Sequence, residues 1–178
     1  MQTSKTKIRK PLENELKIIK KFLYKTRLHG IINLNAIFIL DIEGAIYYDC
    51  FEINEDIYKI LNSINRTPYS LGFYIGSIDP ERGFKPSLPL AFRACRLCRV
   101  GAIPCYILPE RQALRFTYGR CLKSPHLGGD ASMSSNSNIA PVLSEEGYCL
   151  GWGHTRLRAS VKYLCPLVDL GWYLRRGG

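Results

Sequence analysis

The sequence predicts an α+β protein in two parts, an N-terminal α/β domain over residues 1–100 and a small C-terminal β-barrel over residues 101–178. In the first part, segments with helical spacing of apolar residues alternate with short runs rich in β-branched and aromatic residues. From Pro104 onward, short strand-like runs are separated by Gly, Pro and Ser, a pattern typical of a small β-barrel or sandwich. A chain of 178 residues has room for both parts.

The first predicted element is an amphipathic helix, which follows a polar start that we expect to be frayed. Apolar residues recur there at helical spacing: Leu12, Leu16, Ile19 and Leu23. Lysines fill the other faces, and the helix is expected to end at His29 and Gly30. These lysines indicate a solvated face more than a binding site.

A hairpin, a second helix and two more strands are expected next. The runs "AIFIL" and "AIYYDCFEI" flank a turn at Gly44, which predicts the hairpin. Asn54 can cap the helix of "NEDIYKILNSI". The run "SLGFYIGSI" predicts a strand, and "FKPSLPLAFRACRLC" predicts a strand that leads into a short helix or a turn.

The second part is expected to contain short strands, one short helix and one loop. The helix is "ERQALRFTYG", and the polar run at residues 128–138 predicts the loop. The predicted strands are "CYILP", "IAPVLS", "YCLGWG", "TRLRASVKYL" and "CPLVDLGWYLRR".

The charge of the chain favours a polyanionic partner. Lys and Arg number 25 against 15 acidic residues, which gives a formal net charge of +10. Such a surface attracts nucleic acid. The alternatives are an anionic membrane as the partner, or a basic surface that binds no specific partner. No stretch approaches the 18 apolar residues of a membrane span, and no secretory signal is evident. We expect a soluble, intracellular protein without a membrane partner.

The cysteines and histidines do not form a recognisable metal or catalytic motif. Cys95 and Cys98 form a CxxC pair with Cys105 and Cys121 nearby, which allows zinc, but no second pair has metal-ligand spacing. We expect packed, mostly reduced thiols and neither metal nor cofactor, with one or two disulfides as the alternative if the source is a hyperthermophile. The three histidines lie outside any motif, and GxGxxG, P-loop and GxSxG sequences are absent. The sequence therefore predicts a protein that is not an enzyme.

The strongest signal for function is a set of cations interleaved with aromatic residues in the second part. Arg156 and Arg158 point to one face of a strand because side chains alternate along it, and Lys162 shares their parity. Such a row can follow phosphates, and arginine can also stack on unpaired bases. The alternative is a solvated barrel face. The predicted RNA-binding residues are Arg156, Arg158, Lys162, Lys123, Arg120 and Trp152.

Five short motifs carry a resemblance to a known family. They are "RKPLENE", "GAIYYDCFEI", "YGRCLKSPHLGG", "LGWG" and "VDLGWYLRR". Their ordered set resembles the Nip-seven type of ribosome biogenesis factor, and the C-terminal half is similar to a PUA domain. The spacing from "YG" to "LK" is one residue shorter than in that family, and His154, Thr155 and Arg156 stand where small aliphatic residues are common there.

The resemblance implies a pre-PUA α/β domain followed by a PUA-type β-barrel, without catalysis. It implies binding to ribosomal RNA during maturation of the large subunit, through the cations after "LGWG": Arg156, Arg158 and Lys162. Implied partners are proteins of the pre-ribosomal particle, including exosome components, bound by a monomer. The implied location is the cytoplasm of an archaeon or the nucleolus of a eukaryote.

Two other functions remain as alternatives. One is an RNA-modifying enzyme with an accessory PUA domain, which would need a catalytic aspartate such as Asp41 in a pocket. Asp41 and Glu43 are also explained by a hairpin turn without any chemistry. The other is a protein-interaction adaptor that has no affinity for RNA.

Overall fold

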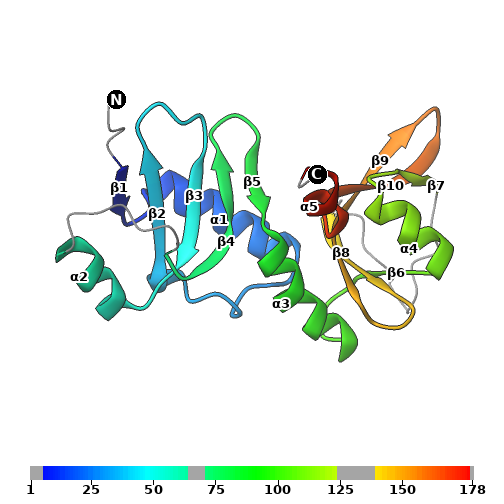
Figure 1. The fold of residues 1–178 in the computed structure, drawn as a ribbon, viewed down its shortest axis with the longest axis horizontal. Helices are drawn as coiled ribbons and strands as arrows, with labels where there is room; N and C mark the ends of the chain where they lie inside the picture. The colour runs from blue at the N-terminus through cyan, green and yellow to red at the C-terminus, as the bar shows by residue number, and fades with distance from the viewer. Residues whose placement is uncertain (1–5, 64–70, 124–138, 177–178) are drawn as a thin grey trace. The chain divides into compact units, whose positions relative to one another are not determined.

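The structure, a computed structural model, describes three stretches of chain: residues 6–63, 71–123 and 139–176. The chain divides into two compact units, one of residues 1–24 and 28–89, the other of residues 25–27 and 90–178. Each unit contains one five-stranded sheet (Figure 1), so the protein is mixed α/β. Within these stretches, no helix has both the length and the apolar content needed to cross a bilayer.

The sheet of the first unit is an antiparallel meander, with its strands side by side in chain order. Its strands are β1 (Thr6–Arg9), β2 (Ile37–Ile42), β3 (Tyr48–Glu52), β4 (Phe73–Asp79) and β5 (Gly83–Pro86). The predicted hairpin is confirmed by β2 and β3, in which Ile39 lies opposite Cys50. Gly44, with φ of +86°, lies in the connecting turn and adopts a conformation that few other residues tolerate.

The helical segments of the first unit are α1 (Glu13–Lys25), the short 3₁₀ helix η1 (Leu34–Ala36) and α2 (Glu55–Ser63). Of these, α1 and α2 pack on this sheet. Helix α1 ends before the expected break, and Arg27 follows it with φ of +59°. The predicted cap of α2 is confirmed, because the Asp56 N–H donates to Asn54 Oδ1 at 3.0 Å.

Both faces of the first sheet are covered. Ile37, Phe38 and Ile39 are all buried, and because successive side chains on a strand point to opposite faces, this requires cover on each side. Helix α1 lies across one face in Figure 1. From α2, Tyr58 packs on Phe38 with ring centroids 4.2 Å apart. On the side of α2, part of the core of this unit is a buried cluster that consists of Phe38, Ile53 and Leu71.

Strand β1 corrects the expectation of a frayed N-terminal segment, because it pairs with β2 along its whole length. The pairing is reinforced by Arg9, whose Nε donates to Asp41 at 3.0 Å and whose two Nη atoms donate to Glu15 at 2.7 and 2.8 Å. The Leu12 N–H also donates to Glu15 at 2.7 Å. The "RKPLENE" motif thus forms a half-buried ionic network that joins β1, α1 and β2.

The second unit contains a five-stranded sheet in the order β6-β8-β9-β10-β7. Its strands are β6 (Tyr106–Leu108), β7 (Leu122–Lys123), β8 (Ile139–Ser144), β9 (Cys149–Arg158) and β10 (Val161–Asp169). Its helices are α3 (Leu88–Arg99), α4 (Glu110–Thr117) and α5 (Gly171–Arg176). The predicted loop at 128–138 and His126 lie outside the described residues.

This second sheet forms a half-barrel, the part of the predicted PUA-type β-barrel that the described residues contain. Its edges are β6 and β7, which do not pair with each other among the described residues. Helix α4 contacts all five strands and contributes Phe116 to the core. Around Phe116 pack Leu108, Leu122, Val142 and Leu164, so the core lies between α4 and the sheet.

Helix α3 belongs mainly to the second unit, whose longer stretch runs from Leu90 to Gly178. Its contacts explain this. The Cys95 thiol lies 3.9 Å from the Val142 carbonyl oxygen, and Arg99 Nε donates to the Gly147 carbonyl at 2.9 Å. The helix is thereby attached to β8 and to the turn that follows it.

Strands β9 and β10 form a hairpin across "TRLRASVKYL", a segment whose sequence predicts a single strand. Arg158 pairs with Val161 across a two-residue turn. The turn residues Ala159 and Ser160 have φ of +44° and +63°, as a type I′ turn requires. Such turns usually contain Asn or Gly, so this hairpin has no recognisable sequence signal.

Candidate nucleic-acid interface

Three side chains form a row across the second sheet. Tyr163 on β10 lies directly opposite Arg156 on β9 and directly opposite Lys123 on β7. Residues that face each other across antiparallel strands project to the same side of the sheet. Tyr163 is half-buried, whereas Arg156 and Lys123 are exposed. The row therefore presents an aromatic ring with a cation on each side.

The sequence predicts that Arg156, Arg158 and Lys162 project to one face, but the hairpin turn places Lys162 on the other face. Arg158 shares a face with Arg156, two residues further toward the tip. Lys162 lies opposite Leu157, and both therefore project to the other face of the hairpin. The expectation that Lys162 belongs to the same stripe is wrong, because the chain reverses direction between Arg158 and Lys162.

Trp152 cannot contribute to an exposed binding surface. Its side chain is 0% exposed, and it lies on β9 opposite Pro141 and Val168. A nucleic-acid base cannot stack on a ring to which it has no access. The predicted contact from Trp152 is therefore wrong, and Tyr163 is the aromatic residue that the sheet places among the cations.

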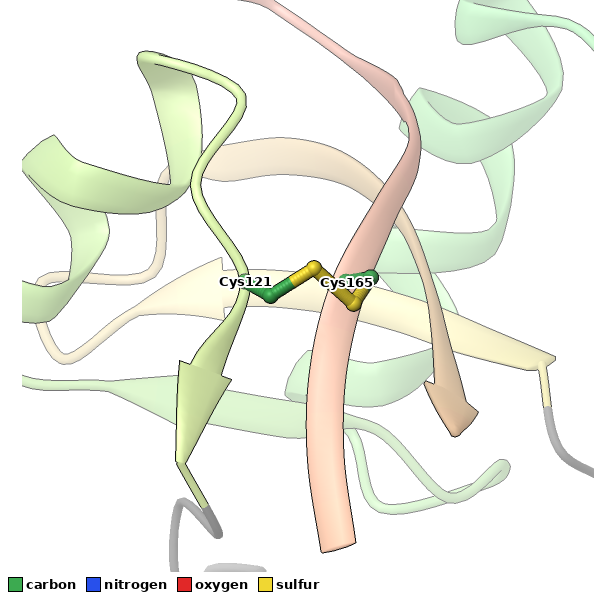
Figure 2. Close-up of a disulfide and its surroundings, with 2 residues drawn as sticks. All are labelled: Cys121 and Cys165. Atoms are coloured by element: carbon green, nitrogen blue, oxygen red, sulfur yellow. A yellow bond between two sulfur atoms is a disulfide. The ribbon is translucent and has the colours of Figure 1, made fainter. Parts of the chain in front are cut away.

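A disulfide lies next to this row (Figure 2). Cys121 precedes β7, Cys165 lies on β10, and the two Cα atoms are 4.1 Å apart. Because Lys123 and Tyr163 are two residues away on their respective strands, the disulfide holds the edge segment that carries Lys123. This covalent bond corrects the expectation that Cys121 is only a packing residue.

His154 lies opposite Cys165 and adds little positive charge to the row. Burial lowers the pKa of His154, and the nearby Arg156 charge lowers it further. The imidazole is therefore neutral at physiological pH, and the cations of the row are supplied by lysine and arginine.

A pocket of about 650 Å³ lies beyond the end of α4 and is lined by Arg115, Tyr118, Arg120 and Arg175. The helix ends in a Schellman motif, in which the Arg120 N–H donates to the Arg115 carbonyl at 3.1 Å and the Gly119 N–H donates to the Phe116 carbonyl at 2.9 Å. This motif places Arg115 and Arg120 at one end of the helix. Gly119, with φ of +77°, is the left-handed residue that follows the C-cap, a position that glycine usually takes in this motif.

Arg175 reaches the pocket from α5 and is held in place there. Its Nη1 and Nη2 donate to the Asp169 carboxylate at 3.0 and 2.8 Å, and Nη1 also donates to the Thr117 carbonyl. Asp169 is buried. Of the pocket residues, only Arg120 is among the predicted RNA-binding residues. Arg175 could not be assigned from the sequence, because 55 positions separate it from Arg120 and only the fold brings the two residues to one pocket.

The buried thiols of this unit form pairs. Cys95 is hydrogen bonded to Cys149, and this bond together with burial raises the pKa of Cys95. Cys98 is similarly paired with Cys105. The sequence places Cys105 and Cys121 near the CxxC pair. In the structure Cys105 and Cys149 are the partners of that pair, whereas Cys121 is bonded to Cys165. In the three described stretches, no group of three or more His, Cys, Asp or Glu is arranged to hold a metal ion.

The half-barrel, its helix α4 and the basic surface define a protein with a PUA domain, the class of domain that binds RNA. Residues 104–178 match the UPF0113 PUA domain family. Over 177 residues the chain is 33% identical to a UPF0113 protein of Aeropyrum pernix, a match that covers 98% of this chain and 95% of that relative. The chain belongs to the UPF0113 family.

The match confirms the PUA domain expected from the sequence, and the domain class is consistent with RNA binding. The matched range includes the row of Lys123, Tyr163 and Arg156. It also includes every residue that lines the arginine pocket. The candidate interface is therefore a property of the PUA domain itself.

Proposed function

We propose that this protein is a non-enzymatic RNA-binding factor that binds pre-ribosomal RNA during maturation of the large ribosomal subunit. The observation that supports RNA binding best is the row of Lys123, Tyr163 and Arg156 on a PUA domain. Cations can neutralise phosphates while an aromatic ring stacks on a base, and this combination suits single-stranded RNA. The formal charge of +10 adds a long-range attraction to the polyanion.

A direct binding measurement tests this proposal. Fluorescence anisotropy with single-stranded oligoribonucleotides should show saturable binding that weakens as salt increases. Each neutralised phosphate of single-stranded RNA contributes a slope of roughly −0.7 to log affinity against log salt. The triple substitution Lys123→Gln, Arg156→Gln and Arg158→Gln should flatten the slope by about 2. Binding that is absent at low salt would instead indicate an adaptor without RNA affinity.

The role in the large subunit needs a cellular measurement. Crosslinking of the protein to RNA in cells, followed by mapping of the reads, should recover sites in precursor RNA of the large subunit. Sedimentation should place the protein with precursor particles. Reads scattered outside ribosomal RNA would contradict this part of the proposal, while leaving RNA binding itself intact.

The absence of catalysis is also part of the proposal. The candidate aspartate of an RNA-modifying enzyme, Asp41, accepts a hydrogen bond from Arg9 at 3.0 Å within the ionic network of the first unit. A carboxylate held in this way is occupied by a structural role. Incubation with transcript RNA, followed by nucleoside analysis, should detect no modified nucleoside. A product that disappears in the Asp41→Ala variant would favour the enzyme.

We further propose that the first unit binds proteins of the pre-ribosomal particle, including exosome components, and that the protein acts as a monomer. Its place of action would be the cytoplasm in an archaeon and the nucleolus in a eukaryote. Affinity purification of the wild-type protein would identify these partners. Variants with substitutions on the surface of the first unit should recover fewer of them. Size-exclusion chromatography with light scattering would establish the oligomeric state.

A further inference from the structure

We propose that the pocket lined by Arg115, Tyr118, Arg120 and Arg175 binds the terminal phosphate of an RNA strand. The ligand is a phosphate monoester at a strand end, together with its nucleotide. This inference rests on the proposed RNA-binding function and names the part of the RNA that the pocket binds.

The charge of the pocket fits a monoester better than an internal phosphate. Three guanidinium groups line it, and the Asp169 carboxylate that pairs with Arg175 leaves a net charge of +2. A phosphate monoester carries about −1.5 to −2 near neutral pH, because its second pKa is about 6. A phosphodiester inside a strand carries only one negative charge. Charge complementarity therefore favours the end of a strand.

The guanidinium groups are available and oriented. Arg115 and Arg120 are exposed, and neither forms an ion pair within the described residues. The Schellman motif fixes their backbone positions, so little conformational freedom of the main chain is lost on binding. The hydrogen bonds of Arg175 to Asp169 and to the Thr117 carbonyl use three of its N–H groups and leave donors on Nε and Nη2. Planar arginine donors match the oxygens of a phosphate.

Tyr118 provides a place for the base of the terminal nucleotide. Its side chain is 64% exposed at the pocket, and an exposed ring can stack on any base. The pocket volume of about 650 Å³ lies within the range of sites that hold a nucleotide-sized ligand. One phosphate with its nucleoside is therefore a ligand of suitable size.

The pocket is connected to the cation row by a very short segment. Arg120 lines the pocket and Lys123 belongs to the row, and three residues of extended chain span at most about 10 Å. Cys121, between them, is covalently attached to β10. The next phosphates of a strand whose end occupies the pocket are therefore within reach of Lys123 on the edge strand β7.

The test compares three oligoribonucleotides of one sequence that differ only at their ends. One carries a 5′-phosphate, one a 3′-phosphate, and one has hydroxyl groups at both ends. Anisotropy with an internal fluorophore should show that one phosphorylated strand binds at least fivefold more tightly than the hydroxyl strand. The Arg115→Gln and Arg120→Gln variants should both lose this preference, and Arg115→Gln should still bind the hydroxyl strand.

A matched control is Arg111→Gln, an exposed position of α4 that does not line the pocket. It should keep the preference for the phosphorylated end. Equal affinity of the wild-type protein for all three strands would overturn the inference while leaving RNA binding established. Loss of the preference in Arg111→Gln as well would overturn the assignment to this pocket. Failure of every strand to bind would contradict the proposed function itself.

Discussion

Tyr163 lies directly opposite Arg156 in the β9–β10 hairpin, while its chain neighbour Lys162 lies opposite Leu157 and projects to the other face. The same aromatic residue also lies opposite Lys123. Lys123 and Arg156 should therefore contribute to RNA binding beside Tyr163, whereas Lys162 should not.

The first prediction compares a cation of the row with one on the other face. Arg156→Gln should weaken RNA binding and flatten the slope of log affinity against log salt by about 0.7, because one phosphate contact is lost. Lys162→Gln removes one charge as well but should leave the slope unchanged. Anisotropy titrations at several salt concentrations measure both. A larger effect from Lys162→Gln would contradict the assigned face.

The second prediction concerns stacking by Tyr163. Tyr163→Leu should weaken binding of single-stranded RNA by about 1 to 3 kcal/mol, since a stacked base is lost. The salt dependence should stay the same, because no charge is removed. Tyr163→Phe keeps the ring and should bind as the wild type does. If the two substitutions weaken binding equally, the ring does not act by stacking.

The third prediction concerns the disulfide between Cys121 and Cys165. The bond closes a loop of 44 residues, and its removal should destabilise the second unit by on the order of 4 kcal/mol. Reduced wild-type protein and the Cys121→Ser, Cys165→Ser variant should show the same lower stability and the same weaker RNA binding. Reduction should not affect the double variant further, because its other cysteines are free thiols. Chemical denaturation and anisotropy measure these effects.

The fourth prediction compares two glycines of positive φ in the second unit. Gly119→Ala and Gly101→Ala should each destabilise by about 1 kcal/mol, because alanine is strained at φ of +77° and +70°. The added Cβ at position 119 would lie 3.3 Å from Arg175 Nη2, whereas at position 101 it meets nothing within 4 Å. Only Gly119→Ala should therefore also weaken RNA binding. Thermal unfolding and anisotropy separate the two effects.

The fifth prediction concerns the pH dependence of the first unit. Burial alone would raise the pKa of Glu15, but hydrogen bonds from Arg9 and Leu12 outweigh it and lower the pKa below the ordinary 4.5. A carboxylate with a lowered pKa stabilises the fold above its ordinary pKa, and this stabilisation is lost as the pH falls through the folded value. Glu15→Gln should destabilise the protein by about 3 kcal/mol at pH 7.

The difference in the free energy of unfolding between wild type and Glu15→Gln should then decrease below pH 4.5, as the wild-type carboxyl becomes protonated. Denaturation curves at several pH values measure it. Glu13→Gln is a suitable control, because the Glu13 side chain is 83% exposed in its pair with Lys17 and should change stability little. A pH-independent difference for Glu15→Gln would contradict the role of its charge.

Much of the fold could be predicted because its signals are local. The helix that begins near Leu12, the hairpin around Gly44 and the cap at Asn54 each depend on residues within a few positions of one another. Strand β1 escaped prediction because four residues of "TKIR" are too few to show alternation. The β9–β10 turn escaped because Ala159 and Ser160 adopt positive φ without the residues that usually signal it.

The sequence by itself determined that the chain has two parts, a strongly basic character and a PUA domain, because composition, local periodicity and the motifs along the chain suffice for these conclusions. Only the tertiary structure decided which cations act together. Strand pairing brings Lys123, Tyr163 and Arg156 into one row, and the packing of α5 brings Arg175 to Arg120. The physical reason is that pairing register and burial arise from contacts between distant residues. The same contacts turn Lys162 away and bury Trp152.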